Sequence, residues 1–186
     1  MRFFRPMHEY NALPLPTTHK QEKLMARPLF SKAWSLFSEV NFDVKTVGDK
    51  IGGKVKFNTD SGIFANACPI RMSYVLNYSG TPIPKPGGKY NVVSGADAKW
   101  YMFRVPEMMS FLAATFGDPE FGKEKPKIAD FANKKGILLV RGSGWSDAVG
   151  HVTLFDGKLC SDACHLTGDP LNGTFTPDKA SIWLLK

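Results

Sequence analysis

The chain has 186 residues, of which 43% are hydrophobic and 22% are charged. This length and composition fit one globular domain that can bury a full core without disulfides or metals. No apolar run approaches the roughly 20 residues that span a bilayer, and no hydrophobic segment follows the basic start MRFFRPMHEY. We therefore expect neither a membrane span nor a classical secretory signal.

The net charge of +7 favours anionic partners such as nucleic acid, membrane headgroups or an acidic cell wall. The lysines are scattered along the chain, and it contains no arginine-rich tract and no familiar nucleic-acid motif. We therefore expect no nucleic-acid partner, and the sequence predicts no cofactor.

Residues 1–25 are expected to form a flexible N-terminal extension, because proline and threonine interrupt them and no periodic pattern emerges. Residues 26–186 are patterned and are predicted to form a single domain. In RPLFSKAWSLFSEV, which begins at Arg27, apolar residues recur at helical spacing. The glycine-rich segment VGDKIGGKVKFNTDSG predicts loops with one short helix.

The segment NACPIRMSYVLNYSG carries the clearest helix signals. Pro69 suits the first helical position, which makes Cys68 the expected N-cap, and Gly80 is placed to end the helix. The proline- and glycine-rich stretch PIPKPGGKYNVVSGAD is too long for a simple connection. It predicts a lid or a binding loop.

Strand-like and helical patterns then alternate toward the C-terminus. KWYMFRV predicts a strand, PEMMSFLAATFG a helix, and PKIADFANKKG a further helix that ends at Gly136. Four short strand-like runs follow: ILLVRG, HVTLF, KLCSDA and SIWLLK. Helices followed by a strand-rich C-terminal half predict an α+β fold, in which the helices pack on a mostly antiparallel sheet.

Cys68 is the first candidate for catalysis. At a helix N-terminus the helix dipole and the free N–H groups favour a thiolate, which is the nucleophilic form of cysteine. The same N–H groups can stabilise an oxyanion that forms beside the sulfur. A buried structural thiol is the alternative.

His151 opens a strand-like run and can accept a thiol proton near neutral pH. A two-residue turn at Asp156-Gly157 would pair Phe155 with Lys158 and, counting outward, His151 with Asp162. Directly opposed residues share one face of the sheet. Asp162 is therefore predicted to orient His151, whereas Asp156 serves the turn.

Two nearby cysteines, Cys160 and Cys164, leave alternatives open. They are close enough along the chain for a local disulfide, which would imply an oxidising compartment. With His165 they could also contribute to a zinc site, but no fourth ligand is evident nearby. The spacing does not fit a haem attachment motif. No metal site is predicted.

Several segments in order resemble the type VI secretion amidase effectors of family four, which are NlpC-type, papain-like cysteine amidases. The resemblance covers about Arg27 to Lys186 and rests on the segments NACPIRMSYVLN, VSGAD, KKGILLV, GWSDAVGHVTLFDG, CSDACHL and WLLK.

The resemblance implies a papain-like fold and delivery from the producer's cytoplasm, without a signal peptide, into a neighbouring cell's periplasm. There the enzyme would cut peptidoglycan stem peptides at the γ-D-glutamyl–meso-diaminopimelate bond. The family's nucleophile, base and acid fall on Cys68, His151 and Asp162, and its paired cysteines on Cys160 and Cys164. It also implies a secretion apparatus and a cognate immunity protein as partners.

Three further residues carry weaker expectations. Asn66 is a candidate second donor, beside the Cys68 N–H, to an oxyanion hole. Trp145 is a candidate to line the cleft and stack on substrate, or else to anchor its loop. For Arg71 we favour a structural ion pair over a clamp for a substrate carboxylate. The competing interpretations of the whole chain are a non-catalytic basic module that binds cell wall or protein, and an acyltransferase on the same fold.

Overall fold

The computed structural model describes residues 25–186. Apart from Met25, the expected N-terminal extension lies outside the described residues. The helices are α1 (Phe30–Ser38), α2 (Val44–Ile51), α3 (Gly53–Asp60), α4 (Cys68–Tyr78) and α5 (Val105–Phe116), with two 3₁₀ turns, η1 (Ile128–Phe131) and η2 (Pro170–Asn172). The strands are β1 (Val92–Ser94), β2 (Trp100–Met102), β3 (Phe121–Glu124), β4 (Gly136–Ser143), β5 (Gly150–Phe155) and β6 (Thr176–Leu184).

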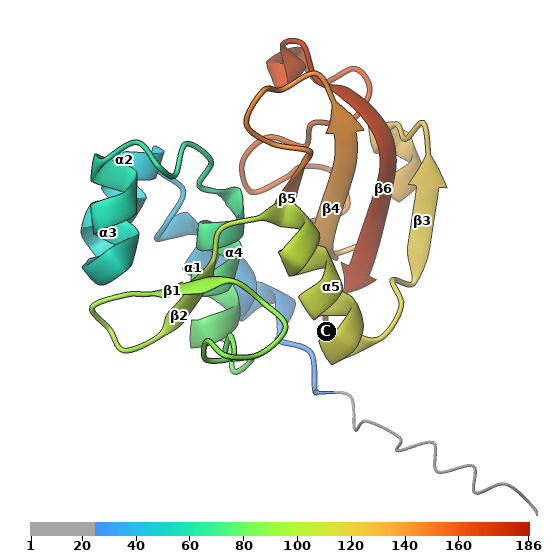
Figure 1. Cartoon of the computed structure of the whole chain (residues 1–186). Coiled ribbons are helices and arrows are strands. Elements are labelled where there is room, and N and C mark those ends of the chain that lie inside the picture. Colours follow the sequence, from blue (N-terminus) through green and yellow to red (C-terminus); the bar gives the residue numbers. More distant parts are fainter. Residues whose placement is uncertain (1–24) are drawn as a thin grey trace, which may run out of the picture.

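The main sheet is fully antiparallel and has the strand order β3-β6-β4-β5. The helices precede most of it in the chain and lie to one side of it, as Figure 1 shows. The predicted α+β class, with helices packed on an antiparallel sheet, is therefore confirmed. In this order β5 is an edge strand of the sheet.

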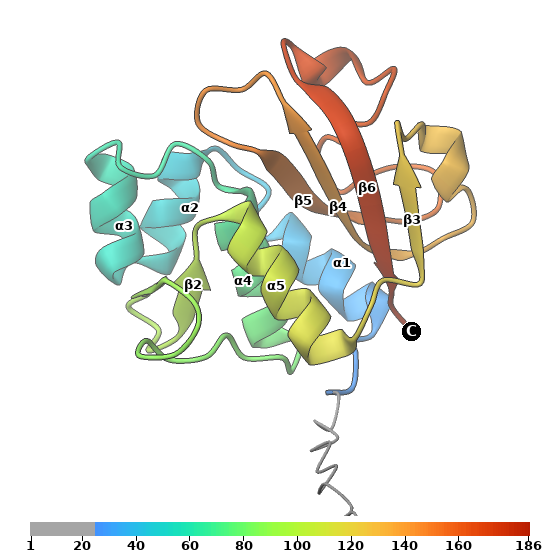
Figure 2. The ribbon, with the colours of Figure 1, turned by 45° about the vertical axis from the view of Figure 1, so that its right-hand side comes forward.

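The largest hydrophobic cluster joins α1, α4 and α5 to one face of the sheet. In the turned view of Figure 2, these three helices lie together beside the strands. Phe37 of α1, Leu76 of α4 and Leu112 of α5 are fully buried there, with Leu139 of β4 and Trp183 of β6. Burying apolar surface on this scale is the main force that fixes the helices against the sheet.

Helix α4 is the central helix, and nine of its residues are buried. Buried polar side chains tie it to its neighbours. The Ser73 hydroxyl accepts the N–H of Met102 in β2, and the Asn77 amide donates to the carbonyl oxygen of Trp100. Because these donors and acceptors are satisfied, the helix is held in one orientation by hydrogen bonds as well as by packing.

The glycine-rich segment after α1 forms two helices, not loops with one short helix. Asp43 caps α2 by accepting the N–H groups of Lys45 and Thr46. Gly52 separates α2 from α3 with a positive φ of 70°, a conformation that glycine adopts without strain. Gly48 lies so close to Thr59 that no larger residue would fit. The glycines thus permit a tight helix pair, which the sequence pattern did not reveal.

Two other predicted elements are corrected. The segment expected to be a late helix forms only the short turn η1, and Gly136, its expected end, begins β4. KLCSDA is not a strand, because only Cys160 makes an isolated bridge, with Phe155. The short strands β1 and β3 were not predicted. Each has only three or four residues, too few for an alternating pattern to be recognised.

The second face of the sheet is covered by the segment between β5 and β6, whose Leu166 and Phe175 are buried against it. A disulfide joins Cys160 and Cys164 within this segment. Among residues 25–186, no helix combines the length and apolar character that crossing a bilayer requires.

Candidate active site

Cys68 was predicted to be the N-cap of α4, but it is the first residue inside the helix. Ala67 is the N-cap, and Pro69 follows in the first turn, where its missing N–H costs nothing. The thiol is unpaired and its residue is 2% exposed. The N-terminus of α4 meets the sheet at its β5 edge, so the sulfur faces side chains of that strand.

His151 projects from the start of β5 and is buried beside Cys68. Its Nε2 lies 3.1 Å from Asp162 Oδ1, which leaves Nδ1 as the ring nitrogen that can interact with Cys68. Burial alone would lower the pKa of this imidazole. The charge of Asp162, together with the neighbouring Cys68, outweighs burial and raises the pKa of His151 to about 10. The three side chains named by the sequence are thus brought together.

Asp162 receives hydrogen bonds on both carboxylate oxygens. Oδ1 accepts from His151 and from the Thr153 hydroxyl at 2.5 Å, and Oδ2 lies 3.0 Å from Nη1 of Arg71. Burial would raise the pKa of this carboxyl group. The charge and hydrogen bond of His151, with Thr153 and Arg71, hold the pKa of Asp162 below its usual range instead. The expected ion pair of Arg71 is therefore present.

The turn after β5 does not have the register from which Asp162 was predicted to face His151. Phe155 pairs with Cys160, not Lys158, so four residues form the loop, and Asp162 falls opposite Thr153. Side chains alternate between faces, so a shift of two residues keeps Asp162 on the face of His151. The hydrogen-bond distance between them is confirmed, although the pairing used to predict it was wrong.

Asp156 does what the turn requires. Its Oδ1 accepts the backbone N–H groups of Lys158 and Leu159, at 2.8 and 2.7 Å. Two accepted hydrogen bonds also lower the pKa of its carboxyl group. These contacts close the four-residue loop, and a carboxylate side chain that caps its own loop in this way is common in turns.

The two expected oxyanion donors are bonded to each other. Asn66 Oδ1 accepts the backbone N–H of Cys68 at 2.9 Å, as in a turn that leads into a helix. The Cys68 N–H is therefore not free in this structure. Asn66 nevertheless lines the hollow in front of the thiol, with Ala67 and Cys68.

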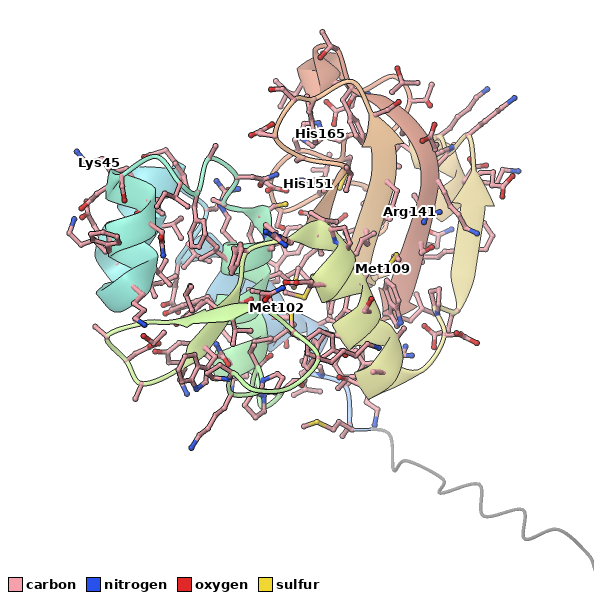
Figure 3. The ribbon with its side chains drawn as sticks, viewed as in Figure 1. Lys45, Met102, Met109, Arg141, His151 and His165 are labelled. Carbon is pink, nitrogen blue, oxygen red and sulfur yellow. A yellow bond between two sulfur atoms is a disulfide. The ribbon has the colours of Figure 1, made fainter. Side chains whose placement is uncertain are left out.

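That hollow has a volume of about 360 Å³, and His165 and Trp145 also line it. The ring of His165 lies 4.7 Å from His151 and 4.7 Å from Trp145, and Figure 3 shows the two histidines side by side. Trp145 also stacks on Phe175 at 4.0 Å. Trp145 thus both lines the cleft and anchors its loop, so the two expectations for it are compatible.

His165 is held by its surroundings in an unusual backbone conformation. Its φ is 49°, its N–H donates to Asp169, and its Nδ1 lies 3.3 Å from Asn172 Oδ1. Sequence reasoning did not select His165 for the catalytic site, and it missed Thr153 entirely. The left-handed backbone at His165 has no reliable sequence signal, and the one available hint was its place beside the paired cysteines.

Cys160 and Cys164 are bonded to each other, with Cα atoms 5.3 Å apart. Their sulfurs are therefore not available to a metal, which removes the zinc alternative for this segment. In the part of the chain that the structure describes, no group of three or more His, Cys, Asp or Glu side chains is placed to hold a metal ion.

Residues 64–184 match the family model of Tae4, described as type VI secretion system amidase effector protein 4. The search of curated proteins gave no significant match. The chain is also similar to solved structures of Tae4 effectors, among them one from Salmonella typhimurium in complex with the immunity protein Tai4 from Enterobacter cloacae. That structure is 51% identical, with a TM-score of 0.83, over 86% of this chain and 100% of that one.

The Tae4–Tai4 complex from Enterobacter cloacae is 53% identical, with a TM-score of 0.83, over 86% of this chain and 99% of that one. Tae4 alone from the same organism is 51% identical, with a TM-score of 0.80, over 87% and 100%. The family match and the solved relatives together show that the chain belongs to the Tae4 family of type VI secretion amidase effectors.

Proposed function

We propose that this protein is an antibacterial peptidoglycan amidase that hydrolyses the γ-D-glutamyl–meso-diaminopimelate bond of stem peptides. Cys68 is the nucleophile, His151 the general base and acid, and Asp162 the orienter of His151. One observation supports these roles most strongly. The buried imidazole of His151 lies between the Cys68 thiol and the Asp162 carboxylate, at the edge of an open hollow.

In the first half of the reaction, His151 already carries the proton taken from Cys68, as its raised pKa favours. The sulfur attacks the γ-carbonyl carbon of D-glutamate, and the carbonyl oxygen becomes an oxyanion. His151 then returns the proton to the departing amine of diaminopimelate, and the C–N bond breaks. Asp162 fixes the ring so that one nitrogen faces the sulfur throughout.

In the second half, water replaces the amine. His151 removes a proton from this water, the hydroxyl attacks the thioester carbon, and the C–S bond breaks. The products are a free γ-carboxylate on the glutamyl fragment and a regenerated Cys68. Water is the acceptor of the acyl group in this step, so the overall reaction is hydrolysis. Acyl transfer would require a different acceptor.

The proposed oxyanion donors are the backbone N–H of Cys68 and the side-chain amide of Asn66. The Cys68 N–H donates to Asn66 in the free enzyme. The incoming carbonyl oxygen displaces Asn66 Oδ1 from this N–H, and positive charge at the N-terminus of α4 favours the exchange. Trp145 offers an aromatic wall to the stem peptide.

The proposal extends to delivery and partners. We place the site of action in the periplasm of a neighbouring cell, reached through the type VI secretion apparatus. The disulfide suits an oxidising compartment, and the positive net charge suits a wall rich in carboxylates. Because relatives are solved with Tai4 immunity proteins, a cognate immunity protein is the proposed inhibitor.

Digestion of diaminopimelate-type sacculi tests the proposal. The wild type should release soluble stem-peptide fragments, whereas Cys68→Ala should release none while keeping its circular dichroism spectrum and melting temperature. Full release by Cys68→Ala would contradict the role of the thiol. Binding to sacculi without release by the wild type would favour the basic binding module instead.

A further inference from the structure

Asp162 lies in a segment that has little regular structure to hold it. Cys160 makes the one bridge of this segment to β5, the Ser161 N–H still donates to the carbonyl oxygen of Leu154, and the chain has no further backbone bond to the strand at Asp162. The position of the carboxylate therefore depends on side-chain contacts. His151 and Thr153 bind one oxygen, and the other oxygen is bound by Arg71.

Arg71 reaches Asp162 from the helix that carries the nucleophile. It follows Cys68 by three residues on α4, so both side chains lie near the same side of the helix. Its Nη1 bonds Asp162, and its Nη2 donates to the carbonyl oxygen of Phe42 in the loop after α1. The guanidinium is thus held at both ends of its fork, in a fixed plane.

The pair is largely shielded from water. The side chains of Arg71 and Asp162 are 15% and 11% exposed, and Nε of Arg71 is buried without a hydrogen-bond partner. Burying an ion pair and an unsatisfied N–H is costly, and an apolar contact would stabilise the fold as well or better. Stability alone therefore does not account for an arginine here.

We propose that Arg71 is a positioning residue, which holds Asp162 in line with His151 and couples the nucleophile's helix to the segment that carries the acid. This proposal rests on the proposed function of Asp162 as the orienter of His151. Arg71 lines the hollow with Cys68 and His151, but its fork is already engaged by Asp162 and Phe42. Its role is exerted through Asp162, not through a substrate carboxylate.

The test is a double-mutant cycle of Arg71→Met and Asp162→Asn on a diaminopimelate stem peptide. Arg71→Met should lower kcat by between about 10- and 100-fold, as expected for a misplaced catalytic group, with KM changed by less than about threefold. In the Asp162→Asn background, Arg71→Met should cause no further loss of kcat, because the carboxylate through which Arg71 acts has been neutralised.

Arg27→Met is a matched control. Arg27 makes the comparable ion pair with Glu120 and also bonds two backbone carbonyl groups, but it does not line the hollow. It should lower the melting temperature without changing kcat of the folded enzyme. If Arg71→Met is too unstable to purify, Arg71→Lys replaces it, because it keeps the charge but loses the fork. Its kcat should fall below that of the wild type, by less than the loss expected for Arg71→Met.

A second measurement needs no substrate, so it separates this inference from the identity of the bond that is cut. Alkylation of Cys68 by iodoacetamide near pH 6 reports the activated thiol. It should be slower in Arg71→Met than in the wild type, and equal in Asp162→Asn and the double variant. Unchanged kcat and alkylation in Arg71→Met, a raised KM with unchanged kcat, or a loss that adds to that of Asp162→Asn would each overturn the proposal.

Discussion

The imidazole of His165 is the second histidine at the site, and its environment favours the neutral form. Burial lowers the pKa of His165, and the charge on the neighbouring His151 lowers it further. Hydrogen bonding to Asn172 and the charges of Asp169 and Asp162 oppose the shift but do not reverse it. A neutral ring beside the proposed base avoids repulsion between two imidazolium ions in one hollow.

The lowered pKa of His165 predicts a dependence of stability on pH. In the unfolded chain the ring protonates near pH 6.5, but in the folded protein it does so at lower pH, so the unfolded state binds more protons in between. The free energy of unfolding should therefore fall as the pH is lowered below about 6.5. The raised pKa of His151 affects stability in a different pH range. Its stabilising contribution is complete below about pH 6.5 and is lost as the pH rises toward about 10.

Urea denaturation of the wild type and of His165→Phe between pH 5 and 7 tests this dependence of the free energy of unfolding on pH. Phenylalanine keeps an aromatic ring against Trp145 and His151 but cannot titrate. The variant should lose less stability than the wild type on acidification. Identical pH dependence in the two proteins would show that His165 does not cause it.

At the scale of single residues, the chemistry of a side chain was easier to predict than its partners. Cys68 and His151 carry signals in their types and local sequence, and alternation of faces sufficed to select Asp162 over Asp156. The bond between Asn66 and the Cys68 N–H was not predicted. It depends on the orientation of one side chain in a loop, for which the sequence has no periodic pattern.

The loop between β5 and the disulfide is the element on which Asp162 depends. Asp156 closes the loop, and the disulfide joins Cys160, which is paired with β5, to Cys164. The two half-cystines enclose Asp162 within a short covalent ring. The disulfide therefore limits how far this segment can move from His151.

Replacing both cysteines, in Cys160→Ser/Cys164→Ser, should lower the free energy of unfolding by about 2 kcal/mol, the value expected for so short a loop. Activity should fall as well, because Asp162 loses a constraint on its position. Urea denaturation and kcat measure the two effects. A variant with wild-type kcat would show that Thr153, His151 and Arg71 hold the carboxylate without the disulfide.

At the scale of elements, length and turn chemistry decided which predictions were confirmed. Helices α4 and α5 have 11 and 12 residues, with proline near the start of each. Both were predicted at close to their observed ends. The pair α2 and α3 was missed because glycines that usually indicate loops here allow close packing. The register of the β5 loop was missed because an Asp-Gly pair does not by itself fix whether two or four residues form a turn.

The whole molecule joins a helical part, which carries Cys68, to a sheet, which carries His151. The joint is the hydrophobic cluster of α1, α4, α5 and one sheet face. The separation of thiol and base is therefore set by core packing, as well as by the local hydrogen bonds of each residue. Binary patterning predicted that helices cover a sheet, but not that α4 meets its β5 edge, since that depends on long-range contacts.

Truncating a core residue of this joint should reduce stability strongly. Phe37 of α1 is fully buried in the cluster and does not line the hollow. Phe37→Ala should lower the free energy of unfolding by about 3–5 kcal/mol, through lost burial and a cavity. Guanidinium denaturation measures this loss. A change below about 0.5 kcal/mol, the range of ordinary surface substitutions, would show that α1 does not secure the joint.

The central claim is that Cys68 cleaves one particular amide of the peptidoglycan stem. The most direct measurement is mass spectrometry of purified diaminopimelate-containing muropeptides after digestion, with the wild type beside Cys68→Ala. The wild type alone should give fragments that end in D-glutamate and peptides that begin with a free diaminopimelate amine. A cut at any other bond, or the same products from Cys68→Ala, would contradict it.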